Sequence, residues 1–524
     1  MQSALLTYYP CSAYLERRQF MLEQYVKKIL SARVYDVAIE SPLQPAPLIS
    51  RRIGNQVLLK REDLQPVFSF KLRGAYNKVA MLTPEQQQKG VICASAGNHA
   101  QGLALAAAHL GIRAVIVMPR TTPEIKVRAV RERGGKAVLF GDTFDEALAH
   151  ARELEEKDGL TFVHPYDDPD VIAGQGTVAM EILRQHSGPL DAVFIPVGGG
   201  GLAAGMAAYI KYVRPDIKVI AVEPADAACL QAAMEKQRRV VLSEVGLFAD
   251  GAAVKQIGKE TFRVLRKHVD EVITASTDEI CAAIKDAFED TRAITEPAGA
   301  LALAGLKKWA ALHDVQGQTL LAVQSGANVN FDRLRHISER AELGEQREAL
   351  IGVSIPERPG AFRQFCQAIG KRAITEFNYR YNDDAQATIF VGVQRRPGED
   401  LAPLMQALGD KGYPVVDMSD NEMAKLHIRH MVGGHTPRQD MDELLFRVEF
   451  PERPGALMNF LTALGGRWNI SLFHYRNHGA AYGRVLVGFQ VPDGQHAQLR
   501  ADLKKVPYPT VEETGNPAYR LFLN

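Results

Sequence analysis

Cysteine is scarce in this sequence. Only five occur in 524 residues, none in a C-x-x-C pair: Cys11, Cys93, Cys229, Cys281 and Cys366. Disulfide scaffolds and zinc modules need paired cysteines. The scarcity argues against both, gives no reason to expect a metal site, and suits a reducing cytoplasm.

Net charge and long apolar runs are also lacking. Lys+Arg 62 against Asp+Glu 61 leaves a formal charge of +1, so there is no electrostatic footprint for nucleic acid. No apolar run approaches the ~18 residues that a membrane helix needs. The N-terminus lacks the charged start and apolar core of a signal peptide. We therefore expect a soluble, cytoplasmic protein that contacts neither nucleic acid nor membrane, and its length allows about two to four domains.

Apolar strands alternate with helical stretches between about residues 75 and 325. We expect strands at 91–94, 114–118, 137–140, 192–197, 219–222 and 319–323. Continuous apolar runs separated by helices predict an α/β fold with a parallel sheet covered on both faces. Ligands bind such sheets at the carboxyl ends of the strands. The residues that follow the strands are therefore the candidate site.

Four motifs carry the chemistry, and three of them directly follow predicted strands: 69–75 (SFKLRGA), 95–102 (SAGNHAQG), 198–202 (GGGGL) and 325–328 (SGAN). Phe70 and Leu72 partly shield Lys71 from water, which favours a neutral amine able to attack an aldehyde. An isolated F-K-L tripeptide is more often an ordinary surface lysine. The presence of the other three motifs in the same chain favours a reactive lysine.

The glycine turn at 198–201 allows two interpretations. Backbone N–H groups without side chains can converge on an anion at a helix start. Alternatively, residues 199–204 with Glu223 about 20 residues later fit a dinucleotide fingerprint. A nicotinamide dehydrogenase would leave Lys71, Asn98 and Ser325 without a role. Two further residues stay ambiguous: Glu296 lies near the substrate or caps a helix, and Arg73 acts in the site or is a structural ion-pair partner.

Taken together, these motifs resemble the fold-type II pyridoxal-phosphate enzymes (tryptophan synthase β-like), and within them the threonine deaminases of isoleucine biosynthesis. The resemblance implies that Lys71 holds pyridoxal phosphate covalently and removes the substrate α-proton. It implies that Ser325 donates to the pyridine nitrogen, a weaker electron sink than an aspartate partner would give. The implied cofactor-binding residues are Lys71, Phe70, Asn98, Gly198, Gly199, Gly200, Gly201, Leu202 and Ser325, and the implied substrate-binding residues are Ser95, Ala96, Gly97, Asn98 and His99.

The same resemblance implies the reaction. L-Threonine would give 2-oxobutanoate and ammonia, the first step of isoleucine biosynthesis. L-Serine differs by one methyl group, a difference that apolar contacts discriminate by only about 1–3 kcal/mol, so some serine turnover is expected. Asn98 as a simple helix N-cap and His99 as a packing residue remain the structural alternatives.

An internal repeat occupies the C-terminal part. Residues 355–362 (IPERPGAF) recur as 450–457 (FPERPGAL), and 377–380 (FNYR) as 473–476 (FHYR). Each copy fits a small βαββαβ sandwich and resembles an α+β, ACT-like regulatory domain. We expect a catalytic part at 1–335 made of two α/β subdomains, a connecting neck at 336–349, and regulatory subdomains at 350–432 and 445–524.

Together with this tandem repeat, the resemblance to the threonine deaminases of isoleucine biosynthesis implies feedback inhibition by isoleucine, relief by valine and a homotetramer. The effector candidates are recurring residues, for each of which core packing is an equal alternative: Tyr379, Arg380, Tyr475 and Arg476. Three other functions remain open. A sister enzyme such as a serine racemase or threonine synthase would share the cofactor site, a dehydrogenase would transfer hydride, and a sensing module with a vestigial catalytic half would bind isoleucine without turnover. The repeat argues against the racemase.

Overall fold

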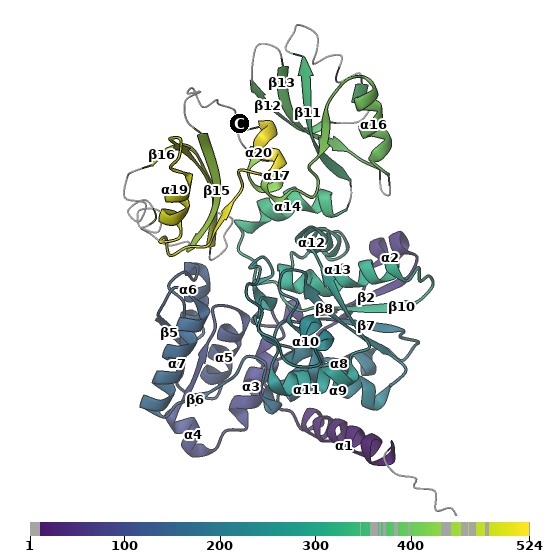
Figure 1. Cartoon of the computed structure of the whole chain (residues 1–524). Helices are drawn as coiled ribbons and strands as arrows, with labels where there is room; N and C mark the ends of the chain where they lie inside the picture. The colour runs from purple at the N-terminus through teal and green to yellow at the C-terminus, as the bar shows by residue number, and fades with distance from the viewer. Residues whose placement is uncertain are drawn as a thin grey trace, which may run out of the picture. The chain divides into compact units, whose positions relative to one another are not determined.

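The chain divides into two compact units, Met1–Phe331 and Asp332–Asn524 (Figure 1). The computed structural model describes residues 11–345, 347–356, 365, 368–369, 374–381, 386–396, 399–430, 442–451, 460, 468–476 and 482–522. Only the backbone is described at 11–20, 374–381, 386–387, 394, 430, 450, 469–476, 483–485 and 490. No helix within these ranges is long and apolar enough to cross a membrane.

A six-stranded sheet forms the centre of the first unit. Its strands follow in the order β1 (Leu43–Pro45), β2 (Gln56–Arg61), β10 (Thr319–Gln324), β7 (Ala192–Pro196), β8 (Lys218–Pro224) and β9 (Glu271–Ala275). All neighbours are parallel except β1, which runs antiparallel to β2. The predicted parallel arrangement is confirmed, and β9 is a strand that the apolar pattern did not predict.

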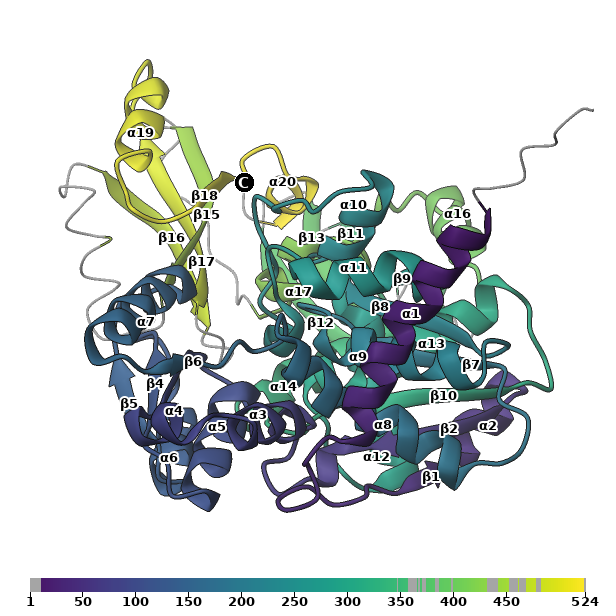
Figure 2. The same cartoon turned by 90° about the horizontal axis from the view of Figure 1, so that it is seen from below.

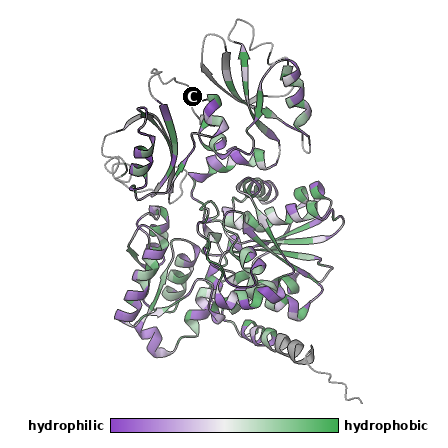
Figure 3. Ribbon diagram, in the orientation of Figure 1, coloured by the Kyte–Doolittle hydropathy of each residue, from purple (hydrophilic) through white to green (hydrophobic). Residues whose placement is uncertain are grey.

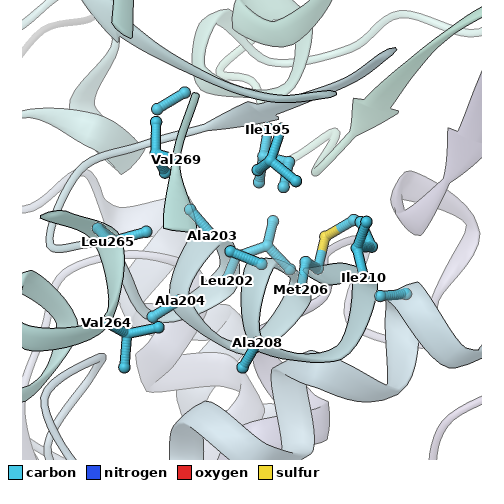
Figure 4. Packing of buried hydrophobic residues seen from close by; sticks show 14 of the residues in the cluster. Ile195, Leu202, Ala203, Ala204, Met206, Ala208, Ile210, Val264, Leu265 and Val269 are labelled. Atoms are coloured by element: carbon cyan, nitrogen blue, oxygen red, sulfur yellow. The ribbon is translucent and has the colours of Figure 1, made fainter. Parts of the chain in front are cut away.

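Helices cover both faces of this sheet (Figure 1). One face carries α8 (Pro169–Gln185), α9 (Gly201–Val213) and α11 (Lys259–His268), and the other carries α12 (Thr277–Thr291) and α13 (Pro297–Leu312). Along β7, Ile195 packs in the cluster with α9 and α11 (Figure 4), whereas Phe194 contacts Trp309 of α13 edge to face. This alternation is the period-2 side-chain pattern of a strand buried on both faces.

The first described helix, α1 (Cys11–Leu30), adds a further layer. Met21, Leu22, Tyr25 and Ile29 lie on one side of it and join the same apolar cluster as α8 and α9. Figure 2 shows α1 lying across these two helices. Through these residues α1 packs on α8 and α9.

A second, four-stranded parallel sheet has the order β5 (Lys136–Leu139), β4 (Ala114–Met118), β3 (Val91–Ala94) and β6 (Thr161–Phe162). Val91 and Cys93 of β3 pack with α3 (Lys71–Ala80) and α5 (Asn98–His109). Ile92 and Ala94 pack with α7 (Phe144–Asp158) on the opposite face. The apolar interior and polar exterior of these layers are visible in Figure 3.

The second unit contains two four-stranded antiparallel sheets of the same topology. The first has the order β12 (Ile374–Tyr381), β13 (Gln386–Gln394), β11 (Glu348–Pro356) and β14 (Val415–Asp417). The other has the order β16 (Asn469–Arg476), β17 (Tyr482–Val491), β15 (Asp442–Pro451) and β18 (Thr510–Glu512). The identical order supports the sequence repeat. The proline-glycine turns after β11 and β15 lie outside the described residues.

Equivalent residues of the two repeats make equivalent hydrogen bonds. The Leu350 N–H donates to Ser419 Oγ at 3.1 Å, and 95 residues later the Leu445 N–H donates to Thr514 Oγ1 at 3.0 Å. The equivalent asparagines even contact one another, since Asn421 Nδ2 donates to Asn516 Oδ1 at 3.1 Å. Contact between equivalent positions is the geometry of a two-fold interface. The repeats thus pack as an internal pair.

A shared apolar core supports this pairing. It draws on both sheets and on three helices: α14 (Arg333–Gly344), α17 (Glu422–Leu426) and α20 (Pro517–Phe522). Phe522 contacts Phe390 edge to face, with ring centroids 5.5 Å apart. The expected neck at 336–349 is mostly α14, which supplies Leu343 to this core, and β11 already begins at Glu348. The segment is therefore packed structure of the second unit.

Four buried charged residues link the elements around the start of α3. Arg73 Nε binds Glu62 Oε2 at 2.8 Å, and its Nη1 binds Glu181 Oε1 at 2.6 Å. Lys60 Nζ binds the other oxygen of Glu181, also at 2.6 Å. All four side chains are fully buried. Arg73 is therefore a structural ion-pair partner, and the cluster joins β2, α3 and α8.

Replacing one member of this cluster should unbalance its charge. Glu181→Leu leaves Lys60 with no carboxylate partner in the cluster, and we expect the free energy of unfolding to fall by about 3–5 kcal/mol. The double variant Lys60→Met/Glu181→Leu removes one charge of each sign and should recover at least half of that loss. Urea unfolding of the intact chain measures both. A double variant no more stable than the single one would contradict the pairing.

Candidate active site

Lys71 is the first residue of α3 and lies at the junction of the two sheets' loops. Its Nζ donates to the Pro165 carbonyl at 3.1 Å and lies 5.2 Å from the centre of the Phe70 ring. Burial lowers the pKa of the Lys71 amine to about 8, although the nearby Glu296 carboxylate acts in the opposite direction. A substantial fraction of the amine is therefore neutral near physiological pH, as a nucleophile requires.

Asn98 begins α5, just beyond the carboxyl end of β3. Its Nδ2 donates to Glu296 Oε1 at 2.5 Å, and its Oδ1 accepts from Asn328 Nδ2 at 2.7 Å. Asn328 in turn donates to the Val67 carbonyl at 2.8 Å. The amide of Asn98 is thus held on both sides in one orientation, and it is not a helix cap, because the cap residue is Gly97.

The position of Glu296 decides between the two roles that the sequence left open, a residue near the substrate or a helix cap. It occupies the N-cap position of α13 but its side chain makes no capping hydrogen bond. The carboxylate instead faces Asn98, and a Cβ added to Gly326 would lie 2.3 Å from its Oε1. Glu296 is therefore part of the site, next to the end of β10.

Ser325 directly follows β10 and is buried. Its Oγ donates to the Ala298 carbonyl at 3.2 Å, and its carbonyl accepts from the Phe70 N–H at 3.3 Å. The neighbouring residues Ser69 and Gly326 pair in an isolated antiparallel bridge. The Lys71 loop and the Ser325 turn therefore run side by side. The hydroxyl of Ser69, fully buried here, has no hydrogen-bond partner among the described residues.

The glycine turn 198–201 follows β7 and opens α9. Gly200 has φ +91°, a conformation that favours glycine. A Cβ at Gly199 would lie 2.2 Å from an atom of the Tyr166 ring, and one at Gly198 would lie 2.9 Å from the Ala252 backbone. The Gly199 carbonyl accepts from Thr261 Oγ1 at 2.7 Å. The turn is thus a close-packed cradle in which side chains have no room.

The loop 95–99 lies between β3 and α5. The Gly97 N–H donates to Ser95 Oγ at 3.3 Å, and nothing lies within 4 Å of a Cβ built on Gly97. His99 is buried, with Nε2 at 2.9 Å from the Val163 carbonyl. Burial and the nearby charge of Lys71 lower the pKa of His99 to about 3, so the imidazole is neutral.

Sequence reasoning missed the segment 163–167. It connects three predicted motifs, because Val163 binds His99, Pro165 binds Lys71, and Tyr166 packs on the glycine turn. The strand before it, β6, has only two residues. Strands of that length leave no periodic signal in a sequence. Proline and tyrosine after an apolar residue were the only cue.

Glu223 is not available to bind a dinucleotide, the role that the fingerprint pattern would give it. This carboxylate is fully buried and accepts from the backbone N–H groups of Leu230 and Gln231, at 2.7 and 2.8 Å. Burial raises its pKa to about 7, against the opposing effect of these hydrogen bonds. Glu223 caps α10 (Cys229–Glu235). The residue that would bind a ribose is therefore occupied within the protein.

Comparison with known proteins agrees with this geometry. Residues 34–326 match the family of pyridoxal-phosphate dependent enzymes, and residues 339–428 and 436–523 match the C-terminal regulatory domain of threonine dehydratase. The biosynthetic L-threonine dehydratase of Burkholderia multivorans is 57% identical over 95% of this chain and 99% of that protein. The chain belongs to the biosynthetic threonine dehydratases. Its counterpart in Escherichia coli K12 is 56% identical over 95% of this chain and 97% of that protein.

Solved structures place the enzyme in the same fold. The processed form of threonine deaminase isoform 2 from Solanum lycopersicum superimposes with a TM-score of 0.60 at 50% identity, covering 61% of this chain and 93% of that one. Serine racemase from Dictyostelium discoideum gives 0.54 at 30% identity, covering 59% and 99%. The predicted fold-type II architecture and the pyridoxal-phosphate dependence are confirmed.

The residues present fit this cofactor. The glycine turn offers backbone N–H groups where a side chain cannot enter, Lys71 offers an amine with a lowered pKa, and the buried Ser69 hydroxyl still needs a partner. Cys93, Cys229 and Cys281 are buried and form no disulfide within the described part of the chain. Tyr379, Arg380, Tyr475 and Arg476 lie in β12 and β16, where their side chains are outside what the structure describes.

Gly199→Ala tests the cradle. The added methyl group must displace the Tyr166 ring, so we expect the affinity for pyridoxal phosphate to fall at least about tenfold, equivalent to about 1.4 kcal/mol. Absorbance titration of the cofactor-free protein measures this. Gly409→Ala, where no heavy atom lies within 4 Å of the new Cβ, is the control and should bind normally. Unchanged affinity in Gly199→Ala would rule out this turn as the phosphate site.

Proposed function

We propose that the chain converts L-threonine to 2-oxobutanoate and ammonia with Lys71 as its catalytic residue. The observation that carries this is the meeting of a pKa-lowered lysine with Asn98 and Ser325 at the carboxyl ends of β3 and β10. Family membership supplies the reaction, and the geometry supplies the residues. We place the enzyme in the cytoplasm, consistent with Cys93, Cys229 and Cys281, which form no disulfide among the described residues.

Pyridoxal phosphate, when bound, supplies the electron-withdrawing ring that acidifies the α-carbon of an attached amino acid. The glycine turn with Leu202 and Phe70 would hold it, with Lys71 as the covalent anchor. Asn98, fixed by Glu296 and Asn328, would donate to the ring hydroxyl oxygen. Ser325 would donate to the ring nitrogen. A neutral hydroxyl leaves that nitrogen unprotonated, which favours elimination over a long-lived carbanion.

Lys71 would then act as the general base. Its neutral amine takes the α-proton of the substrate at Nζ, a role that a pKa near the working pH suits. The N–H groups of Ala96, Gly97, Asn98 and His99 would bind the substrate carboxylate at the start of α5, where the helix dipole favours an anion. The Ser95 N–H, predicted to join them, already donates to the Val117 carbonyl at 3.1 Å, so Ser95 would contact the substrate through its hydroxyl. L-Serine should also react, because loss of one methyl costs only about 1–3 kcal/mol.

Lys71→Ala tests this assignment. Borohydride reduction of the wild-type holoenzyme followed by peptide mapping should place a pyridoxyl label on Lys71, and the variant should show no label there. Formation of 2-oxobutanoate should fall by about 10²–10⁴-fold, the usual contribution of a general base. Lys78→Ala, on the same helix, is the matched control and should keep the label. A label on another lysine would refute the assignment.

A serine racemase activity is the second candidate, because a racemase shares this fold at 30% identity. That racemase matches only 59% of this chain while 99% of its own length is covered, so it offers no counterpart for the second unit. The two functions differ in product. A chain that interconverts the serine enantiomers without forming 2-oxobutanoate from L-threonine would be a racemase.

We further propose that isoleucine inhibits the enzyme through the second unit, that valine relieves this inhibition, and that the enzyme is a homotetramer. Support comes from the match to a regulatory domain and from the repeat. Tyr379 pairs with Ile389 in β13, and Tyr475 pairs with Val485 in β17, so the register is the same in both copies. Both candidates lie on edge strands of their sheets, and the outward N–H and C=O groups of an edge strand can pair with another backbone or an amino acid.

Substituting the recurring arginines in the full chain tests the effector site. Arg380→Ala or Arg476→Ala should raise the isoleucine concentration for half-inhibition by at least about tenfold, since a hydrogen bond to a charged group contributes about 1.5–3 kcal/mol. Arg500→Ala is the control, because Arg500 pairs with Glu512 on the surface. If both test variants respond to isoleucine as the control does, these arginines do not bind the effector.

A further inference from the structure

His99 carries a buried polar atom whose purpose the proposed function leaves open. Its side chain is 3% exposed, and Nε2 lies 2.9 Å from the Val163 carbonyl oxygen. Because a carbonyl can only accept, Nε2 carries the hydrogen. The neutral ring then has a bare lone pair on Nδ1, which has no hydrogen-bond partner among the described residues. A buried acceptor without a donor is unusual and suggests a partner that arrives during the reaction.

Lys71 is held by the same short segment. Its Nζ donates to the Pro165 carbonyl at 3.1 Å, two residues beyond the carbonyl that binds His99. Two residues of chain span at most about 7 Å between Cα atoms. The imidazole and the amine therefore bind neighbouring carbonyls, and the charge of Lys71 influences the imidazole directly. The lysine side chain is flexible and its ammonium has three rotatable donors, so it can form a second hydrogen bond beside the one to Pro165.

We propose that His99 is a positioning residue for Lys71: Nδ1 accepts a hydrogen bond from the lysine ammonium after it has taken the substrate α-proton. This inference rests on the proposed role of Lys71. The Val163 carbonyl holds the hydrogen on Nε2 and so fixes the tautomer in which Nδ1 can accept. In histidines generally, the hydrogen bond of one ring nitrogen sets the role of the other. While this hydrogen bond lasts the proton stays on Lys71 Nζ, since the imidazole is too buried to become charged, and Lys71 loses it before the next turnover.

The groups around this pair define what a substitution would change. Glu296 at the start of α13 is the carboxylate that raises the pKa of Lys71. His164, whose pKa burial lowers to about 4, is neutral, and its Nδ1 already accepts from the N–H groups of Tyr166 and Asp167. Asp167 accepts from the backbone of α11. A hydrogen bond from the ammonium to Nδ1 favours the charged form of Lys71, so its removal should lower the pKa of Lys71 further.

The test compares two replacements of His99. The amide nitrogen of Gln in His99→Gln can occupy the place of Nε2 and donate to Val163, but it leaves no acceptor at the Nδ1 position. His99→Asn restores a polar group near Nδ1 and loses the bond to Val163. His164→Asn is the matched control, since the Asn oxygen can replace Nδ1 of His164 as acceptor for the two N–H groups.

Two measurements report on Lys71. In the cofactor-free protein, the pH dependence of Lys71 acylation by acetic anhydride, read by mass spectrometry, gives its titration midpoint. In the holoenzyme, the acidic limb of the kcat profile for L-threonine, which reports ionisations of the enzyme–substrate complex, gives the same group during turnover. We expect His99→Gln to move both to lower pH by about one unit, and His99→Asn and His164→Asn to stay within a few tenths of wild type.

An unshifted midpoint in folded His99→Gln would overturn the proposal and leave His99 as a packing residue. If His99→Gln fails to fold, His99→Leu, which also lacks an acceptor at the Nδ1 position, replaces it, and an unshifted midpoint in folded His99→Leu would overturn the proposal. Failure of the proposed function looks different: the pyridoxyl label then appears on a lysine other than Lys71, whatever the acylation midpoints are.

Discussion

The neutral, buried cluster of Lys60, Glu62, Arg73 and Glu181 determines where the reactive lysine lies. Burying a single unpaired charge costs far more free energy than burying cations and carboxylates that pair with one another. These four residues therefore have to lie together, and their pairing brings β2, α3 and α8 into contact. Lys71 lies two residues before Arg73 on α3. Because the two cations are matched by two carboxylates, the cluster adds little net field at Lys71. Burial and Glu296 are left to set its pKa.

The site itself consists of loops that the two parallel sheets bring together. Polar side chains there are held by fixed hydrogen bonds. Asn98 is bound by Glu296 and Asn328, and the Lys71 amine is bound to the Pro165 carbonyl. Such fixed partners reduce the reorganisation that a reaction would otherwise require. The segment 163–167 extends this principle, because one stretch of backbone orients an imidazole, an amine and an aromatic ring over the glycine turn. The five residues that follow the two-residue strand β6 thus position much of the site.

The second unit follows a different logic. Two copies of one sheet topology pair through equivalent residues, with Asn421 and Asn516 in direct contact and a common apolar core that includes Phe390 and Phe522. A change in one copy can therefore reach the other through a packed interface rather than through a flexible linker. That arrangement suits the regulatory domain that this part of the chain matches.

The sequence alone determined the fold class, the strand and helix alternation, the four motifs and the repeat. The elements and motifs each span about ten residues or a few more, and the repeat is a copy of such segments 95 residues later. Local hydrophobic period selects strand or helix, and parallel strands place their following loops at one edge. Only the tertiary structure decided that Glu296 faces Asn98, that Glu223 caps α10, and that Arg73 meets Glu62 and Glu181. These contacts join residues up to 198 positions apart, and they are selected by packing and by the pairing of buried charges, which no local pattern encodes.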